Sequence, residues 1–395
     1  MFNPLEWQIR IITDQVEKAG YLLTESQLQH LRVQLSEQEN SDNFDIDIPG
    51  IDDDIIINFS QEEELEIIVQ QIENSIPSLL NESVDIASEE LTSSLKKDAP
   101  RMLKQHKRIE LNFQKKIASI WGKSLDLLET LLVIAVEAGD NINDCLRDEA
   151  SKNQDYVFDV VARLHARSCQ IGYEILTLLR AGYADGAHAR WRSLHELIVV
   201  AYYISDQGQE TAKRYLLHEV VDRNKATKMY QEHFLALGVL PVDEKELEDL
   251  KQSEKDVITE VAFDDNDAKF YKKEYGWASS EEHRDPKFVD IAKKSGFLHM
   301  SPYYKWASHN IHAGPMRFHT SLGLLGIEDD VLSTGPSTQG LTIPGHSTAV
   351  AIMQITTLFL NFENTVDNVA LCKVLDTFSE DIGKLFIEAE KLTLN

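Results

Sequence analysis

Residues 156–205 read YVFDVVARLHARSCQIGYEILTLLRAGYADGAHARWRSLHELIVVAYYIS, and this stretch decides the fold class. On both sides of Gly182-Tyr183, apolar residues recur every three or four positions, which is the spacing of an amphipathic helix. The stretch therefore predicts two helices, Tyr156–Ala181 and Asp185–Ser205, joined by a tight turn. Two long helices with so short a connection are expected to pack antiparallel, as in a helical bundle.

The helical spacing continues on both sides of this hairpin. Upstream, Asp98-Ala99-Pro100 is typical of a helix start, and apolar residues at helical spacing continue from there to Gly139. Downstream, helices are expected at Glu210–Leu237, Ser301–Gly314, Ser347–Leu371 and Thr377–Leu392. One short strand is expected at Ile55–Phe59, but no alternation of period two persists. We predict an all-α fold, a multi-helix bundle with an N-terminal acidic helical region.

Charge divides the 395 residues unevenly. Residues 1–99 carry 22 acidic and 5 basic side chains, a net charge of −17, whereas the remaining 296 residues hold about −10 of the total −27. We predict a helical hairpin at 1–38, an acidic linker at 39–60, an acidic helical segment at 61–99 and the main bundle at 100–395. The acidic region is expected to solvate the chain or to bind a protein partner.

Composition also limits the class of protein. A broadly basic surface for nucleic acid is not expected, although a local basic pocket remains compatible with the charge. Three cysteines (Cys145, Cys169 and Cys372) lie far apart without metal-ligand spacing, as expected for thiols in a reducing compartment. Neither a signal peptide nor a membrane span is expected, so we predict a cytoplasmic protein that does not contact membranes.

The densest polar group lies in the second helix of the hairpin. His188, Arg192, His195 and Glu196 fall on one helical face, and Arg192 and Glu196 are spaced for an ion pair. Such a pair can simply fix the packing of a neighbouring helix. Alternatively, a fixed positive charge beside imidazoles could hold a phosphate or perform acid–base chemistry near neutral pH.

Four of the thirteen histidines gather within 21 residues: His299, His309, His312 and His319. On the helix expected here, Lys305, Ser308, His309 and His312 share a face. His309 and His312 could ligate a metal, Ser308 and His312 could form a nucleophile pair, or a histidine could join Arg192 or Arg190 at a phosphate-binding site. A polar network that seals the end of the bundle is the structural alternative. No cofactor is expected.

These residues carry a resemblance. The pattern Gly-Tyr-x3-Ala-x4-Arg-x3-Glu ends at Arg192 and Glu196, and Tyr-x3-Ser-x3-His follows far downstream at Tyr304, Ser308 and His312. Together these patterns resemble a bacterial family of helical proteins known only as a domain of unknown function, over roughly residues 100–375. The resemblance implies that Arg192, Glu196, Ser308 and His312 form one polar site, and it implies no reaction.

A more distant similarity is to the HEPN superfamily, helical and often dimeric proteins that include RNases of toxin and phage-defence systems. The superfamily motif has an arginine and a histidine separated by four to six residues. Arg190 and His195 have this spacing, but so do Arg101 and His106, and Trp191 stands where those enzymes usually have a polar residue. Lys305 and His312 are spaced similarly, with lysine in place of the bidentate arginine.

Three hypotheses follow from these patterns. In the first, the chain is a HEPN-like ribonuclease effector that cleaves RNA without a metal, as a homodimer, with histidine as general base and arginine at the phosphate. In the second, it is a non-enzymatic helical module for a protein, RNA or nucleotide partner, and its polar residues are structural. In the third, it is a metal-dependent hydrolase that uses His309 and His312.

Overall fold

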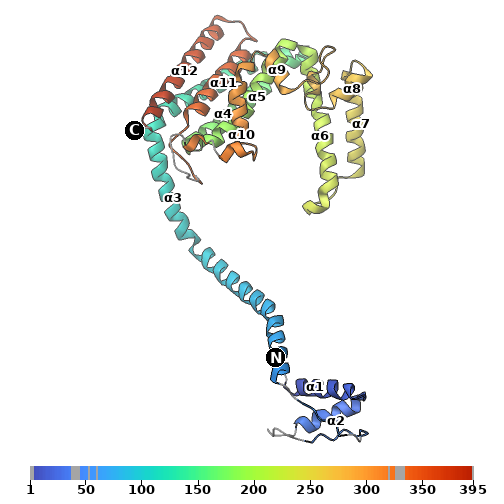
Figure 1. The fold of residues 1–395 in the computed structure, drawn as a ribbon. Coiled ribbons are helices and arrows are strands. Elements are labelled where there is room, and N and C mark those ends of the chain that lie inside the picture. Colours follow the sequence, from blue (N-terminus) through green and yellow to red (C-terminus); the bar gives the residue numbers. More distant parts are fainter. Residues whose placement is uncertain are drawn as a thin grey trace. The chain divides into compact units, whose positions relative to one another are not determined.

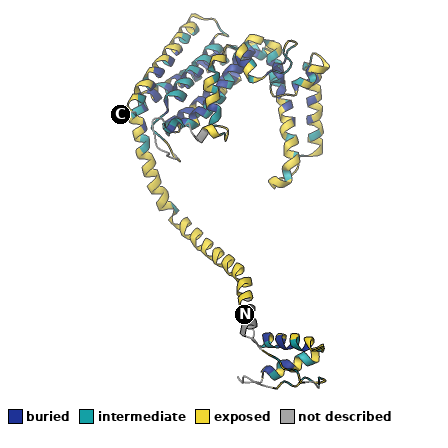
Figure 2. Ribbon diagram, in the orientation of Figure 1, coloured by how far each residue is buried: buried dark blue, intermediate teal, exposed yellow. Residues whose placement is uncertain are grey.

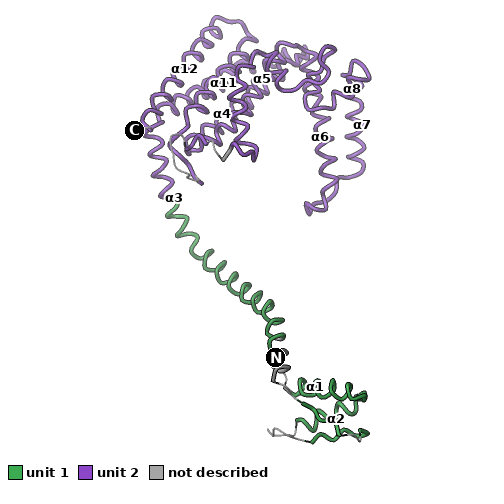
Figure 3. Tube along the Cα trace, viewed as in Figure 1, with its two compact units in different colours: residues 1–106 green, residues 107–395 purple. Residues whose placement is uncertain are grey.

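The computed structural model describes residues 4–36, 45–51, 54–58, 61–318, 321–324 and 334–393. The chain divides into two compact units, Met1–His106 and Lys107–Asn395 (Figure 3). Within the described residues every regular element is a helix, which confirms the predicted all-α fold. Residues 54–58 have no regular structure, so the short strand expected at 55–59 is wrong for these positions, and residue 59 lies outside the described residues.

Unit 1 contains a small helical pair and the first part of a very long helix. Helix α1 (Pro4–Lys18) packs on α2 (Glu25–Ser36), as the sequence predicts. Their shared core is built from Ile9, Ile12, Val16, Leu31 and Leu35. Partly buried isoleucines from the described parts of 45–58 pack against this core. These parts of the expected linker therefore belong to the same small hydrophobic core as α1 and α2.

Helix α3 (Gln61–Asn153) runs from one unit into the other without a break (Figure 1). The helix start expected at Asp98-Ala99-Pro100 is therefore wrong, because Pro77 and Pro100 both lie inside α3. A proline removes one backbone hydrogen bond and can kink a helix without ending it. The local sequence thus indicated a helix start at a position where α3 in fact continues through the proline.

Unit 2 is a bundle that continues from α3 through α4 (Tyr156–Arg180) and α5 (Ala184–Gln207), the predicted hairpin. Its other helices are α6 (Gln209–Leu237), α7 (Glu244–Val261), α8 (Asp265–Tyr271), α9 (Phe288–Lys294), α10 (Ser301–His309), α11 (Thr342–Leu360) and α12 (Val366–Lys391), with short 3-10 turns at 276–278, 298–300, 315–318 and 322–324. The last two helices break near residue 361 and not near 372 as expected. The apolar run of α11 ends at Leu360, and the Thr365 hydroxyl accepts the Asn368 amide at 3.1 Å as the N-cap of α12.

The core lies where the α4–α5 hairpin meets α11 (Figure 2). Trp121, Phe158, Trp191, Phe359 and Phe386 are among its largest buried side chains. The hairpin turns at Gly182, whose φ of +79° suits glycine. A Cβ there would also meet the Phe113 ring and the Ser337 carbonyl, so this position excludes larger residues twice over.

By length and composition, α11 could also cross a membrane. It packs between α4, α5 and α12, and 56% of its most apolar window is buried inside the protein. This is the environment of a core helix in a bundle. A membrane-spanning helix would instead turn most of its apolar side chains toward lipid.

Two helical glycines provide a matched test of this packing. We expect Gly345→Ala to lower the free energy of unfolding by about 1–3 kcal/mol, because its Cβ would lie 2.3 Å from the buried Phe386 ring. Gly122→Ala meets nothing within 4 Å and should leave stability unchanged or raise it by up to about 1 kcal/mol. Chemical denaturation of both variants measures the difference. Equal stabilities would contradict the close contact between α11 and α12.

Candidate functional site

Helices α5 and α10 bring Tyr304 of the downstream motif to Arg192 and Glu196 of the upstream motif. The Arg192 Nη2 atom donates to the Tyr304 hydroxyl at 2.8 Å, and this hydroxyl donates to the Glu196 Oε1 atom at 2.6 Å. Arg192 and Glu196 also form the expected ion pair, at 3.1 Å within α5. The three side chains close a ring of interactions between residues more than a hundred positions apart in the sequence.

Tyr304 is held from two sides. Its ring stacks on Phe288 with centroids 4.8 Å apart, and the Arg192 guanidinium lies over it at 4.8 Å. Burial, together with the hydrogen bond to Glu196, raises the pKa of Tyr304 to about 12 against the opposing effect of Arg192. The phenol therefore remains protonated at neutral pH, and it is the hydrogen-bond donor to Glu196.

Arg192 is not fully satisfied by this ring. Its Nε atom is buried and has no hydrogen-bond partner within the described residues. The side chain as a whole is 21% exposed, so a ligand at the surface could reach the guanidinium. A planar guanidinium with unused donors is suited to a phosphate or a carboxylate.

His188 and His195 of α5 are buried, whereas the Arg192 side chain is partly exposed. Trp191 lies between them, with ring centroids 5.6 Å from His188 and 5.2 Å from His195, and its Nε1 atom donates to the Ser347 carbonyl of α11. Burial lowers the pKa of both His188 and His195 to about 4. Both rings are therefore neutral near pH 7 and belong to the packed aromatic layer around Trp191.

The other motif residues lie toward the end of α10. The Ser308 hydroxyl donates to the Tyr304 carbonyl of its own helix at 2.8 Å. The helix ends at His309, earlier than expected, although the His312 amide still donates to the Ser308 carbonyl at 3.1 Å. Lys305 and His312 are exposed and His309 is half-buried. His319 lies outside the described residues.

Arg190 points to a different neighbour. It forms an ion pair with Glu174 of α4, so the two arginines of α5 serve opposite sides of the helix. Its motif partner His195 is only 4% exposed. The structure therefore does not present Arg190 and His195 together at the surface.

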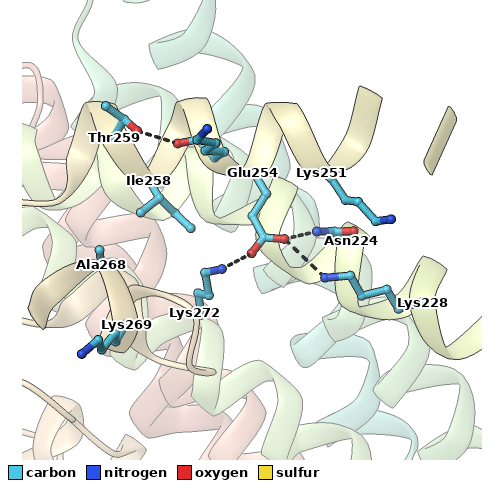
Figure 4. A pocket seen from close by; sticks show the side chains of 10 residues that line it. Asn224, Lys228, Lys251, Glu254, Ile258, Thr259, Ala268, Lys269 and Lys272 are labelled. Atoms are coloured by element: carbon cyan, nitrogen blue, oxygen red, sulfur yellow. Dashed lines mark hydrogen bonds and ion pairs between the residues drawn. The ribbon is translucent and has the colours of Figure 1, made fainter. Parts of the chain in front are cut away.

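A lysine-lined pocket of about 560 Å³ between α6, α7 and α8 was missed by the sequence reasoning (Figure 4). Five lysines line it: Lys228, Lys251, Lys255, Lys269 and Lys272. Glu254 lies among them and is reached by Lys272 at 2.9 Å, by Lys228 at 3.8 Å and by the Asn224 amide (Figure 4). One carboxylate cannot balance five ammonium groups, so the pocket is suited to an anion.

Next to this pocket, a buried arginine fixes the loop after α8. Arg214 of α6 pairs with Asp267 at 2.9 Å and donates to the Gly276 carbonyl at 3.0 Å and to the Ser279 hydroxyl at 2.7 Å. Both charged side chains are almost fully buried. A buried charge is tolerated when its hydrogen bonds are satisfied, so this network is structural.

The described residues do not provide the set of ligands that a metal site needs. Within the described residues, no group of three or more His, Cys, Asp or Glu side chains is arranged to hold a metal ion. His309 and His312 are thus a pair without a third protein ligand in that part of the chain, whereas protein zinc sites use three or four.

Comparison with models of protein families gives a match over the middle of the chain. Residues 158–329 match the model of a family of unknown function (DUF5677), a narrower stretch than the 100–375 expected. This stretch contains the Arg192, Glu196 and Tyr304 ring and the lysine-lined pocket. No curated protein and no solved structure matches the chain.

Buried neutral histidines predict how stability depends on pH. His165, His188 and His195 each have a pKa of about 4 because burial disfavours their charged forms, whereas the unfolded value is near 6.5. Between these values the unfolded chain binds more protons, so stability should fall as pH drops from about 6.5 to 4. Above pH 6.5 these histidines are neutral in both the folded and the unfolded chain, so they no longer make the free energy of unfolding depend on pH.

The variant His195→Phe isolates one of these groups. Phenylalanine retains the ring beside Trp191 but does not titrate, so the loss of stability between pH 6.5 and 4 should be smaller than in the parent protein. His233→Gln, at an exposed histidine of α6, serves as the control. Urea denaturation at several pH values measures each slope. Parallel curves for parent and His195→Phe would contradict a buried, neutral His195.

Proposed function

We propose that the chain is a HEPN-like ribonuclease effector of a bacterial toxin or phage-defence system, with its site on α5, on α10 and on the residues just after α10. The observation that carries this proposal is the contact between Arg192 and Tyr304 across the two motifs. It brings an arginine with an unpaired buried Nε atom next to the helix that leads to His312.

The geometry favours His312 over His195 as the reacting histidine. A general base must reach the 2′-hydroxyl of the RNA, and His195 is buried behind Trp191 whereas His312 is exposed. His312 would accept the 2′-hydroxyl proton while the 2′-oxygen attacks the adjacent phosphorus. The bond to the 5′-oxygen breaks, leaving a 2′,3′-cyclic phosphate, and the 5′-oxygen takes a proton from water. Arg192 would stabilise charge on the phosphate.

The first experiment measures RNA cleavage by the purified full chain in the presence of a chelator. We expect His312→Ala to lower the cleavage rate by about 10²–10⁴-fold, the usual contribution of general acid–base catalysis. His299→Ala is the control, because His299 is exposed and lies outside the motif. Equal cleavage by parent and His312→Ala, or no cleavage by the parent, would refute the ribonuclease proposal.

A second candidate function is a non-enzymatic module that binds a phosphorylated ligand. The observation that favours it is the lysine-lined pocket. Lys251, Lys255 and Lys269 have no ion-pair partner within the described residues, so their charge is available to a ligand. On this view the ring of Arg192, Tyr304 and Glu196 is a structural link between α5 and α10.

This second function is tested by titrating inorganic triphosphate and ATP into the full chain by calorimetry. We expect Lys251→Glu with Lys269→Glu to weaken binding at least about tenfold, since two favourable charges become repulsive. Lys245→Glu provides a control on the same helix α7, because Lys245 is exposed and does not line the pocket. The same loss in the control, or no binding by the parent, would refute a phosphate site in this pocket.

A further inference from the structure

The part of helix α3 that belongs to unit 1 is largely exposed from residue 69 on (Figure 2). Its exposed residues include a row of apolar side chains. Between residues 69 and 102 their exposed fractions range from 44% to 63%, although they include leucine, isoleucine, valine and methionine. The members on one face are Val69, Ile72, Ile76, Leu80, Val84, Leu91, Leu95 and Met102. None of them belongs to the core formed by α1 and α2.

These residues form one seam along the helix, interrupted by Glu73 and Asp98, which fall on the same face. Val69, Leu80, Leu91 and Met102 are each 11 residues apart, and so are Val84 and Leu95. Eleven residues make three helical turns, so such a repeat keeps apolar side chains on one face over a long distance. Repeats of this kind are typical of helices that pair along their length.

Charge along α3 is separated into two blocks. Residues 61–95 contain nine acidic and no basic residues. Residues 96–104 then carry Lys96, Lys97, Arg101 and Lys104 against the single acid Asp98. Two such helices side by side in parallel would place like charges together, whereas an antiparallel pair places the acidic block against the basic block.

An antiparallel register centred near residue 93 satisfies both patterns. It opposes Val84 to Met102 and Leu91 to Leu95 of a second chain, and it places 82–90 beside 96–104. Pro77 falls outside the overlap. Pro100, at about 100° per residue, lies away from the seam, where its ring meets no second helix.

We propose that residues 80–106 of α3 pair with the same segment of a second copy of this chain in an antiparallel coiled coil. The occupant is a second copy because the segment is complementary to itself in both apolar spacing and charge. This inference does not depend on the proposed function and assigns no role to the residues of α5 or α10.

The test measures the mass of the full chain in solution by analytical ultracentrifugation over a range of concentrations. We expect the parent to be a dimer at micromolar concentration, and Leu91→Glu with Leu95→Glu to be a monomer. Ile86→Glu is the matched control, since Ile86 is 54% exposed on the same helix but lies off the seam, and it should remain a dimer. Circular dichroism confirms that each variant keeps its helix content.

Two outcomes would overturn the proposal. One is a parent that remains monomeric up to about 100 µM, where a specific pair should already form. The other is a seam variant that dimerises like the parent, which would place the interface elsewhere in the chain.

A spin label decides the orientation of the pair. In a chain with Cys145 and Cys372 replaced by serine, a label at Ser78→Cys should give an inter-label distance of about 45 Å, from 1.5 Å rise per residue over 30 residues. A distance below about 25 Å would mean a parallel pair and would overturn the antiparallel register. Cys169 is buried and should not take the label.

Discussion

The bundle depends on one constraint, which is that α5 is surrounded on most sides by other helices. It packs on α4, α6, α9, α10 and α11. Its polar side chains must therefore find partners inside the protein, because a buried polar group without a partner costs free energy. Trp191 binds the Ser347 carbonyl on one side, and Arg192 and Glu196 bind Tyr304 on another. These contacts fix where α11 and α10 lie against α5.

Much of the fold could be predicted because helical spacing is a local property. The α4–α5 hairpin and helix α6 lie close to their predicted ranges. The errors occurred where a local signal competes with a longer one. Asp98-Ala99-Pro100 is a good helix start by itself, but α3 already exists on both sides of it and a proline only removes one hydrogen bond.

Less of the candidate site could be predicted, because tertiary contacts determine which partner each side chain meets and whether it is exposed. The spacing of Arg192 and Glu196 predicted their ion pair, which the structure contains. Spacing could not show that Arg190, two residues earlier, turns to Glu174. It also could not distinguish exposed His312 from buried His195, since both lie in amphipathic segments. The lysine-lined pocket needs lysines from α6, α7 and α8, which only the fold brings together.

The two parts of α3 differ in the width of their apolar face, and they belong to different units. From Ile117 to Ile142 the helix has a wide apolar face, with Trp121, Leu128 and Leu132 fully buried against several neighbours. Before residue 107 the apolar face is one narrow seam flanked by charges. A wide face suits the core of a bundle and a narrow seam suits a single partner helix. The environment changes along one unbroken helix, so the width of the apolar face marks the boundary that no proline or glycine marks.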